Sequence, residues 1–247
     1  MDALVGGLYQ QDLAYIQAAA YGGQARGAAP EVVRRLRNAA IAVRRVVEVG
    51  CGAGPLTEAL TAAGFEVTGI DPSADLLAIA RTVAPAARLV SASIYDAEIP
   101  ACEAIVALGE PLTYHDADAD AERRIGGFFR RASKVLPRGG LLIFDVIEDG
   151  GPSLEGRSWN LGEDWAVLVE TTEDPASQSL TRNIETFRRL GATYRRGREA
   201  HRVHLFDTGS LCHELAACGF ETQTSRAYGA QVLPPRRLAF FAVRTGA

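Results

Sequence analysis

The stretch VVEVGCGAGPLT, residues 46–57, decides the fold that the sequence predicts. Its valine-rich start, residues 46–49, is typical of a buried parallel strand. Three glycines at alternate positions, 50, 52 and 54, then allow a tight turn in which backbone N–H groups face a ligand. Pro55 suits the first position of the next helix, where a missing N–H costs no intrahelical bond. The stretch therefore predicts a strand, a ligand-binding turn and a helix.

The spacing of these glycines bears on which cofactor the turn holds. A dinucleotide fingerprint G-x-G-x-x-G that starts at Gly50 needs its third glycine at position 55, where this chain has Pro55. Glu48, inside the strand, suits a positively charged ligand better than a phosphate. Residues 48–54, E-V-G-C-G-A-G, resemble the first motif of the class I methyltransferases that use S-adenosylmethionine (SAM). The resemblance implies a SAM cofactor and a Rossmann-like α/β sheet of seven strands with helices on both faces.

The rest of the chain fits this fold. Apolar runs at residues 65–70, 88–91, 104–108 and 141–146 predict further strands, and amphipathic or capped segments at 56–63, 75–81 and 119–136 predict helices. The segment GIDPSADLLAIAR resembles the second motif of the family, and LPRGGLLIFD resembles the segment after its fourth motif. A helix at 210–218 and strands at 220–226 and 238–243 complete the sheet, with an antiparallel final hairpin implied by the resemblance.

Two segments lie outside this repeating pattern. Residues 1–43 are expected to form an N-terminal helical cap, in which Pro30 opens a helix that runs to about Val43. Residues 44–247 form the SAM-binding domain, and residues 160–207 within it are rich in β-forming residues separated by turn signals. These residues are expected to add antiparallel strands after the fifth strand, as a lid over the site, so that the chain is a single overall domain.

The expected cofactor site lies at the carboxyl ends of the strands. Asp71 ends a strand about 20 residues after the first glycine, where a carboxylate can accept both ribose hydroxyls. Either Ser93 or Asp96 holds the adenine amino group, and Ile94 contacts the ring. The resemblance adds Tyr15 from the cap. The full set of expected cofactor residues is Tyr15, Glu48, Gly50, Cys51, Gly52, Asp71, Pro72, Ser93, Ile94, Leu108 and Gly109.

Methyl transfer from a sulfonium needs alignment, and an oxygen or nitrogen nucleophile must also lose a proton. The catalytic candidates are Tyr114 and His115 on the loop after the fourth strand and His201 on the inserted strands, with His204 as a further histidine. His201 and Glu199 are expected on one strand face and His204 on the other. Glu110 either structures its loop or takes part in the chemistry.

Composition narrows the partners. The formal charge of −4 with interspersed acids and arginines gives no basic stripe for nucleic acid, so a small-molecule substrate is expected. Lys134 is the only lysine beside 25 arginines, and this bias points to bacterial secondary metabolism as the source of the substrate. No apolar run is long enough to span a membrane, and no signal peptide is expected, which points to a cytoplasmic enzyme. The four cysteines show no metal-ligand spacing. A homo-oligomer is compatible with the sequence.

Other functions stay open at this stage. A SAM-binding enzyme with a non-methyl reaction, such as a cyclisation, would keep every cofactor motif and change only the pocket. A NAD-dependent oxidoreductase is disfavoured by Pro55 and Glu48. A catalytically silent partner subunit is disfavoured by the intact cofactor segments.

Overall fold

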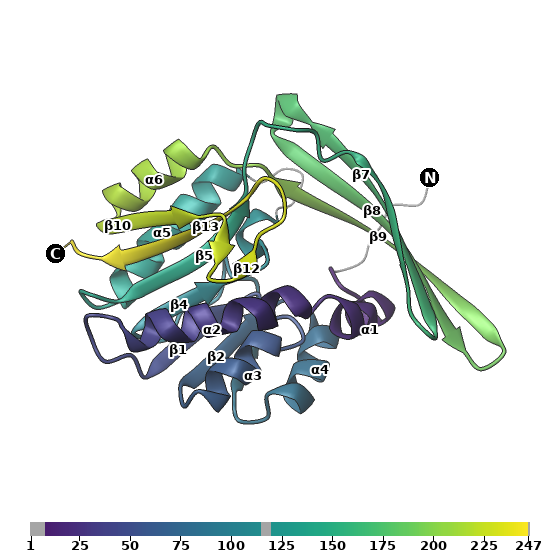
Figure 1. The fold of residues 1–247 in the computed structure, drawn as a ribbon, viewed down its shortest axis with the longest axis horizontal. Helices are drawn as coiled ribbons and strands as arrows, with labels where there is room; N and C mark the ends of the chain where they lie inside the picture. The colour runs from purple at the N-terminus through teal and green to yellow at the C-terminus, as the bar shows by residue number, and fades with distance from the viewer. Residues whose placement is uncertain (1–7, 115–119, 247) are drawn as a thin grey trace.

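The computed structural model describes residues 8–114 and 120–246, which form a Rossmann-like domain and an antiparallel lid sheet (Figure 1). His115 lies outside the described residues. The helices are α1 (Gln11–Ala20), α2 (Gly23–Arg37), α3 (Pro55–Ala62), α4 (Ala74–Val83), α5 (Ala121–Val135) and α6 (Thr208–Ala217), with short 3-10 turns at η1 (Pro111–Thr113) and η2 (Pro175–Ser177).

The central sheet has seven strands in the order β10-β13-β5-β4-β1-β2-β3. Six of the strands are β1 (Arg45–Val49), β2 (Glu66–Asp71), β3 (Arg88–Ser91), β4 (Ala104–Ala107), β5 (Leu141–Ile147) and β10 (Phe220–Ser225). The seventh, β13 (Arg237–Arg244), lies between β5 and β10 and runs antiparallel to both. The expected seven-stranded sheet and its antiparallel final hairpin are therefore confirmed.

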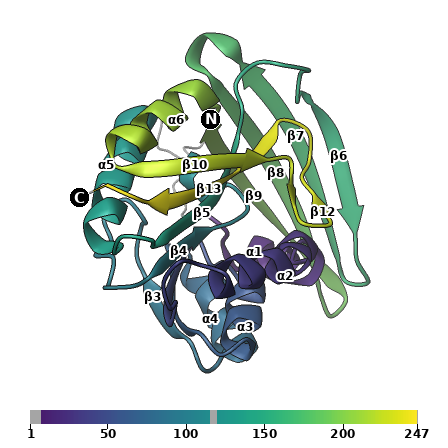
Figure 2. The same cartoon turned by 60° about the vertical axis from the view of Figure 1, so that its left-hand side comes forward.

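Apolar residues of the sheet pack on both of its faces, because successive side chains of a strand point to opposite sides. Val46 joins a core with α2 and α3, whereas its neighbour Val47 joins a core with α5 and α6. Figure 2 shows the two sets of helices on either side of the sheet. This burial on both faces explains the near-continuous apolar run at residues 46–49.

The lid sheet has four antiparallel strands in chain order: β6 (Gly156–Leu161), β7 (Trp165–Asp174), β8 (Ser179–Leu190) and β9 (Thr193–His204). The last three confirm the predicted antiparallel insertion. The sequence analysis expected the insertion to cover residues 160–207, and β6 corrects this bound because the inserted sheet already begins at Gly156. All six residues of β6 are exposed, so the strand shows no alternation of buried and exposed positions that a pattern could reveal.

The N-terminal segment also differs from the prediction. The helix expected to open at Pro30 starts at Gly23 and ends at Arg37, with Pro30 inside it. Proline interrupts a helix by removing one backbone hydrogen bond. Here the buried stripe of Ala28, Ala29, Val32 and Leu36 against the sheet offsets that loss. Gly27 is part of this packing, because a Cβ there would lie 2.0 Å from the side chain of Gln231 in β12 (Gln231–Val232), which pairs with β11 (Ala227–Tyr228).

Helix α1 lies between the two sheets (Figure 1). Its Leu13 and Ile16 pack on Trp165, Val167 and Ile184 of the lid. Its Ala14 packs on the opposite side against Ala53 and Leu76 of the central domain. The helix therefore holds the lid at a fixed place over the carboxyl ends of the central strands.

Candidate active site

A single cavity of about 1350 Å³ lies where the central sheet, α1 and the lid meet. Its walls come from the loops after β1, β2, β3 and β4, from the start of the chain, and from the inner face of the lid. In an open α/β sheet, ligands bind at these carboxyl ends of the strands. The topology therefore places this cavity where the sequence analysis expected the site.

The glycine turn after β1 forms one wall of this cavity. Gly50 and Gly52 both have positive φ, 66° and 54°, which favours glycine. A Cβ on Gly50 would lie 2.3 Å from the Cβ of Pro111, so this glycine lets the loop after β4 pack closely. A Cβ on Gly52 would meet no protein atom within 4 Å. The space in front of Gly52 is therefore open for a ligand.

Asp71 shapes the same wall. Its carboxylate accepts hydrogen bonds from the backbone N–H of Gly52 at 2.9 Å and of Ser73 at 2.8 Å, one on each oxygen. Burial raises the pKa of Asp71, and these two N–H donors oppose the rise. A carboxylate oxygen can accept more than one hydrogen bond, so both oxygens keep capacity for hydroxyl donors of a ligand.

Glu48 lies at the floor of the cavity, almost fully buried, and accepts a hydrogen bond from Thr57 Oγ1 at 2.5 Å. Burial raises its pKa to about 8, although the Thr57 hydrogen bond favours the charged form. A cationic ligand beside Glu48 would reverse this effect by stabilising the carboxylate.

A third wall is formed by the loop after β3. Ser93, Ile94, Tyr95 and Asp96 all line the cavity. The Tyr95 hydroxyl donates to the Leu112 carbonyl at 2.6 Å, and the guanidinium of Arg124 lies 4.4 Å from the Tyr95 ring centre. Because Ser93 and Asp96 both line the cavity, either side chain can meet the polar edge of a ligand. The sequence analysis missed Tyr95, although an aromatic residue next to Ile94 was a readable signal.

Glu110 is buried between two arginines that the sequence analysis did not identify. Arg182 from β8 lies 2.5 Å from one of its carboxylate oxygens, and Arg237 from β13 contacts the other. Asp145 of β5 accepts hydrogen bonds from the N–H groups of Gly109 and Glu110, each at 2.9 Å. These contacts fix the loop after β4. Of the two roles considered for Glu110, they support the one in which it structures its loop.

Four residues from three distant segments meet at the substrate side. Tyr9 and Tyr114 share a hydrogen bond between their hydroxyls at 2.8 Å, and their rings flank the imidazole of His201 with centres 4.8 Å and 5.8 Å away. His201 Nε2 lies 2.8 Å from Glu199 Oε2. Glu199 also accepts the backbone N–H groups of Tyr9 and Gln10, at 2.7 Å and 2.8 Å.

The protonation states in this cluster follow from burial. Burial raises the pKa of both Tyr9 and Tyr114, so their hydroxyls are neutral hydrogen-bond donors. Nε2 of His201 faces the Glu199 carboxylate, so the tautomer that donates from Nε2 to this carboxylate has Nδ1 as its acceptor. The contact between His201 and Glu199 confirms that the two side chains share one strand face.

Most of the predicted site residues come together. The cavity is lined by Glu48, Gly50, Cys51, Gly52, Asp71, Pro72, Ser93, Ile94, Leu108, Gly109, Tyr114 and His201. Tyr15 is not among the lining residues, because its ring stacks under Arg188 and its hydroxyl faces Asp164 at the lid. Tyr9, which lies before the start of α1, lines the cavity instead. His204 packs against Phe206, away from the cavity lining.

Within residues 8–114 and 120–246, no group of three or more His, Cys, Asp or Glu side chains could hold a metal ion. In the same ranges no helix is long and apolar enough to cross a membrane.

Comparison with known proteins gives the following matches. Residues 46–140 match the family model described as a methyltransferase domain. A ubiquinone biosynthesis O-methyltransferase of Aromatoleum aromaticum is 53% identical over 45 residues, which cover 18% of this chain and 19% of that protein. A putative methyltransferase, YqeM, of Bacillus subtilis is 26% identical over 72% of this chain and 73% of its own. The chain thus spans about a fifth of the first relative and about three quarters of the second.

A solved structure resembles the whole chain. It is that of SAM-bound CalS10, an amino pentose methyltransferase from Micromonospora echinaspora, with a TM-score of 0.74 and 20% identity over 99% of this chain and 100% of that one. The likeness at this identity establishes the shared fold, including the lid.

Proposed function

We propose that this chain, whose residues 46–140 belong to the methyltransferase domain family, is a SAM-dependent methyltransferase that acts on a small molecule. The observation that carries the proposal is the single cavity shared by the glycine turn, Asp71 and the His201 cluster. One end has the residues for the cofactor, and the other has a group able to accept a proton. The whole-chain likeness to a SAM-bound methyltransferase supports the same cofactor.

The residues present fit this cofactor. The open space at Gly52 lets the backbone approach it closely, and Asp71 has acceptor capacity for both ribose hydroxyls. Ile94 and Tyr95 offer apolar contact to the adenine. Glu48 offers a carboxylate for the cationic end, because a positive charge nearby would lower its raised pKa. When bound, SAM supplies an electrophilic methyl group on a sulfonium.

The chain's own contribution to the reaction is alignment and proton removal. His201 Nδ1 would accept the proton of a hydroxyl or amine nucleophile, while Glu199 holds the ring in place and stabilises its charged form. Tyr9 and Tyr114 would orient the nucleophile through their neutral hydroxyls. A carbon nucleophile would use the same alignment. His201 is 1% exposed, and its shielding from water strengthens these interactions.

The inner face of the lid favours a substrate with a polar end and an apolar body. Thr171, Arg182 and His201 lie in one cross-strand row that faces the cavity. The next row presents Val169 and Ile184. The amino sugar named for the structural neighbour is a polar small molecule of this general kind. We infer a small metabolite, with its nucleophile near the polar row.

Calorimetry tests the cofactor assignment: SAM should bind the purified protein and NADH should not. Transfer of a labelled methyl group to a panel of hydroxyl and amine acceptors then tests the reaction. With an accepted substrate, His201→Asn should lower kcat at least tenfold and leave SAM affinity within twofold. His213→Asn, on α6, is the matched control. Binding of NADH in place of SAM would overturn the proposal, and SAM binding with turnover but no methylated product would favour a non-methyl reaction.

A further inference from the structure

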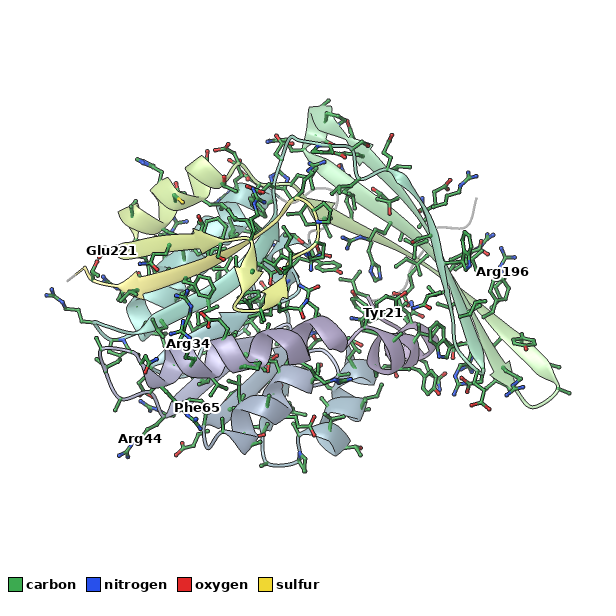
Figure 3. All side chains as sticks on the ribbon, viewed as in Figure 1. Tyr21, Arg34, Arg44, Phe65, Arg196 and Glu221 are labelled. Atoms are coloured by element: carbon green, nitrogen blue, oxygen red, sulfur yellow. The ribbon has the colours of Figure 1, made fainter. Side chains whose placement is uncertain are left out.

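The outer face of the lid carries exposed apolar side chains at its first strand. Trp159 is 74% exposed, Leu161 68% and Leu168 of the neighbouring strand 46%. Leu161 lies in one cross-strand row with Ala166, Phe187 and Arg196. Figure 3 shows Arg196 on the side of the lid away from the central domain. The apolar side chains of β6 therefore point away from the cavity, whereas Ser158, which precedes Trp159 and points to the opposite face, lines it.

Strand β6 is also an edge of the lid sheet, because its one pairing partner within the described residues is β7. Exposed edge strands are usually protected by charged residues, proline or a covering segment. The strand GRSWNL has one charged residue, Arg157, and no proline. An exposed edge strand of this kind presents unpaired backbone groups and is a template for pairing with another strand.

The sequence of β6 and its turn is self-complementary. An antiparallel pairing of two copies about Asn160 places Trp159 opposite Leu161 of the second copy, and Leu161 opposite its Trp159. The same register brings Arg157 to Glu163 of the second copy. Shifting the centre to Trp159 would place Arg157 opposite Leu161, and shifting it to Leu161 would place Trp159 opposite Glu163. Only the register about Asn160 matches apolar with apolar and basic with acidic residues among these three.

The backbone is compatible with this register. The N–H of Gly162 donates toward β7, to the Trp165 carbonyl at 2.9 Å, so the N–H groups of Leu161 and Trp159 point to the open edge. These two residues are the hydrogen-bonded pair that a centre at Asn160 requires. The Leu161 N–H at present meets the side chain of Asn160 at 2.9 Å, a contact that pairing would replace.

We propose that β6 is the interface of a homodimer, in which two copies pair edge to edge about Asn160 and join their lids into one eight-stranded sheet. The charges support a second copy as the partner. Glu163 is exposed and forms no ion pair among the described residues, and Arg157 is 83% exposed beside Glu170. In the dimer Arg157 lies between Glu170 of its own chain and Glu163 of the second copy. The cavity-facing side of the lid is left unobstructed.

Sedimentation velocity of the full chain tests the proposal. The expected particle has twice the 26.4 kDa of one chain. Trp159→Asp should increase the dimer dissociation constant at least a hundredfold, whereas Tyr194→Asp, exposed to a similar extent on the β8–β9 hairpin, should not change it. Circular dichroism melting confirms that both variants fold. A wild-type monomer at micromolar concentration, or a dimer that Trp159→Asp leaves intact, would overturn the proposal.

Two further experiments test the register. Glu163→Arg should weaken the dimer, because the new arginine lies near Arg157 of the second copy and the two positive charges repel. Adding Arg157→Glu should restore the affinity, because the two charges are then exchanged. Asn160→Cys should form a disulfide-linked dimer on mild oxidation, since the two copies of residue 160 face each other. Ser158→Cys, two residues away on the same strand, should not. Equal cross-linking of the Asn160→Cys and Ser158→Cys variants would contradict the register. So would a failure of the double charge reversal to restore the dimer.

Discussion

Glu110 and Arg182 lie 72 positions apart in the sequence, and their side chains form an ion pair of 2.5 Å that joins the loop after β4 to the lid. Burial alone would raise the pKa of Glu110, but Arg237 and Arg182 hold it below its ordinary value. The carboxylate is therefore charged at neutral pH, and the lid is anchored to the central domain by a buried charge pair.

Removing Arg182 should destabilise the protein. Arg182→Met leaves Glu110 buried with one of its two cationic partners, and breaking a buried pair typically costs about 3–5 kcal/mol. Urea unfolding followed by circular dichroism measures the loss, with Arg189→Met on the same strand as control. Glu110→Gln combined with Arg182→Met should cost less than the sum of the single changes. Strict additivity would mean that the pair does not contribute as a unit.

Glu48 should make stability depend on pH. Its pKa is about 8 in the folded protein and near the ordinary value of 4.5 when unfolded, so the folded state binds more protons between these values. Stability of the ligand-free protein should therefore fall as the pH rises from about 4.5 to 8. Glu48→Gln should remove this slope and raise stability at pH 8 by a few kcal/mol. Thermal melts at pH 5 and 8 measure both effects, and equal slopes in the two proteins would contradict the assignment.

SAM binding should couple to the same proton. A cationic ligand beside Glu48 favours its carboxylate, so binding at pH 7 should release protons to the buffer. Titration calorimetry in two buffers of different ionisation enthalpy detects this as a difference in observed heat. Glu48→Gln should abolish the difference. Identical heats for the wild-type protein would show that Glu48 does not respond to the ligand.

Asp71→Asn should weaken SAM binding. The amide keeps one acceptor oxygen in place of two, so the hydrogen bonds to the second oxygen are lost. This loss should cost about 1–3 kcal/mol of binding free energy, or a roughly tenfold to hundredfold loss of affinity. Asp75→Asn, four residues later on α4, is the control and should bind normally. The melting temperature of Asp71→Asn, measured alongside, separates a direct loss of binding from a disruption of the loop that Asp71 holds. Wild-type affinity in Asp71→Asn would refute the ribose assignment.

The two glycines of the turn should respond differently to substitution. Gly50→Ala would force a Cβ to within 2.3 Å of Pro111 and should lower the melting temperature by several degrees. Gly52→Val has free space around its Cβ and should keep more of the stability, although its positive φ costs about 1 kcal/mol or more. Its side chain would fill the cofactor space, so SAM binding should be lost. Retained binding in Gly52→Val would place the cofactor elsewhere.

The sequence predicted the central sheet well because its signals are local. A valine run, three glycines and Pro55 specify strand, turn and helix within twelve residues, and Asp71 follows at a fixed offset. The contacts of Glu110 could not be predicted in this way. Arg182 and Arg237 reach it from strands far along the chain, and nothing near either arginine marks it as a partner.

The N-terminal cap shows a second limit. Tyr9 and Tyr15 are equivalent in the sequence pattern, and the choice between them depends on how α1 sits against the lid. Tyr9 precedes the helix with a positive φ of 53°, which directs it into the cavity, whereas Tyr15 lies on the face toward Arg188. Tertiary packing also placed Pro30 inside a helix, against its local preference.

The undivided cavity has a consequence for inhibition. Its volume of about 1350 Å³ exceeds the roughly 300–1,000 Å³ typical of a site for one small ligand, and no wall of described residues separates the Asp71 end from the His201 end. A compound that joins an adenosine part to an acceptor-like part by a short linker could fill both ends at once. Because the second part then binds at a high effective concentration, such a compound should bind far more tightly than either fragment alone.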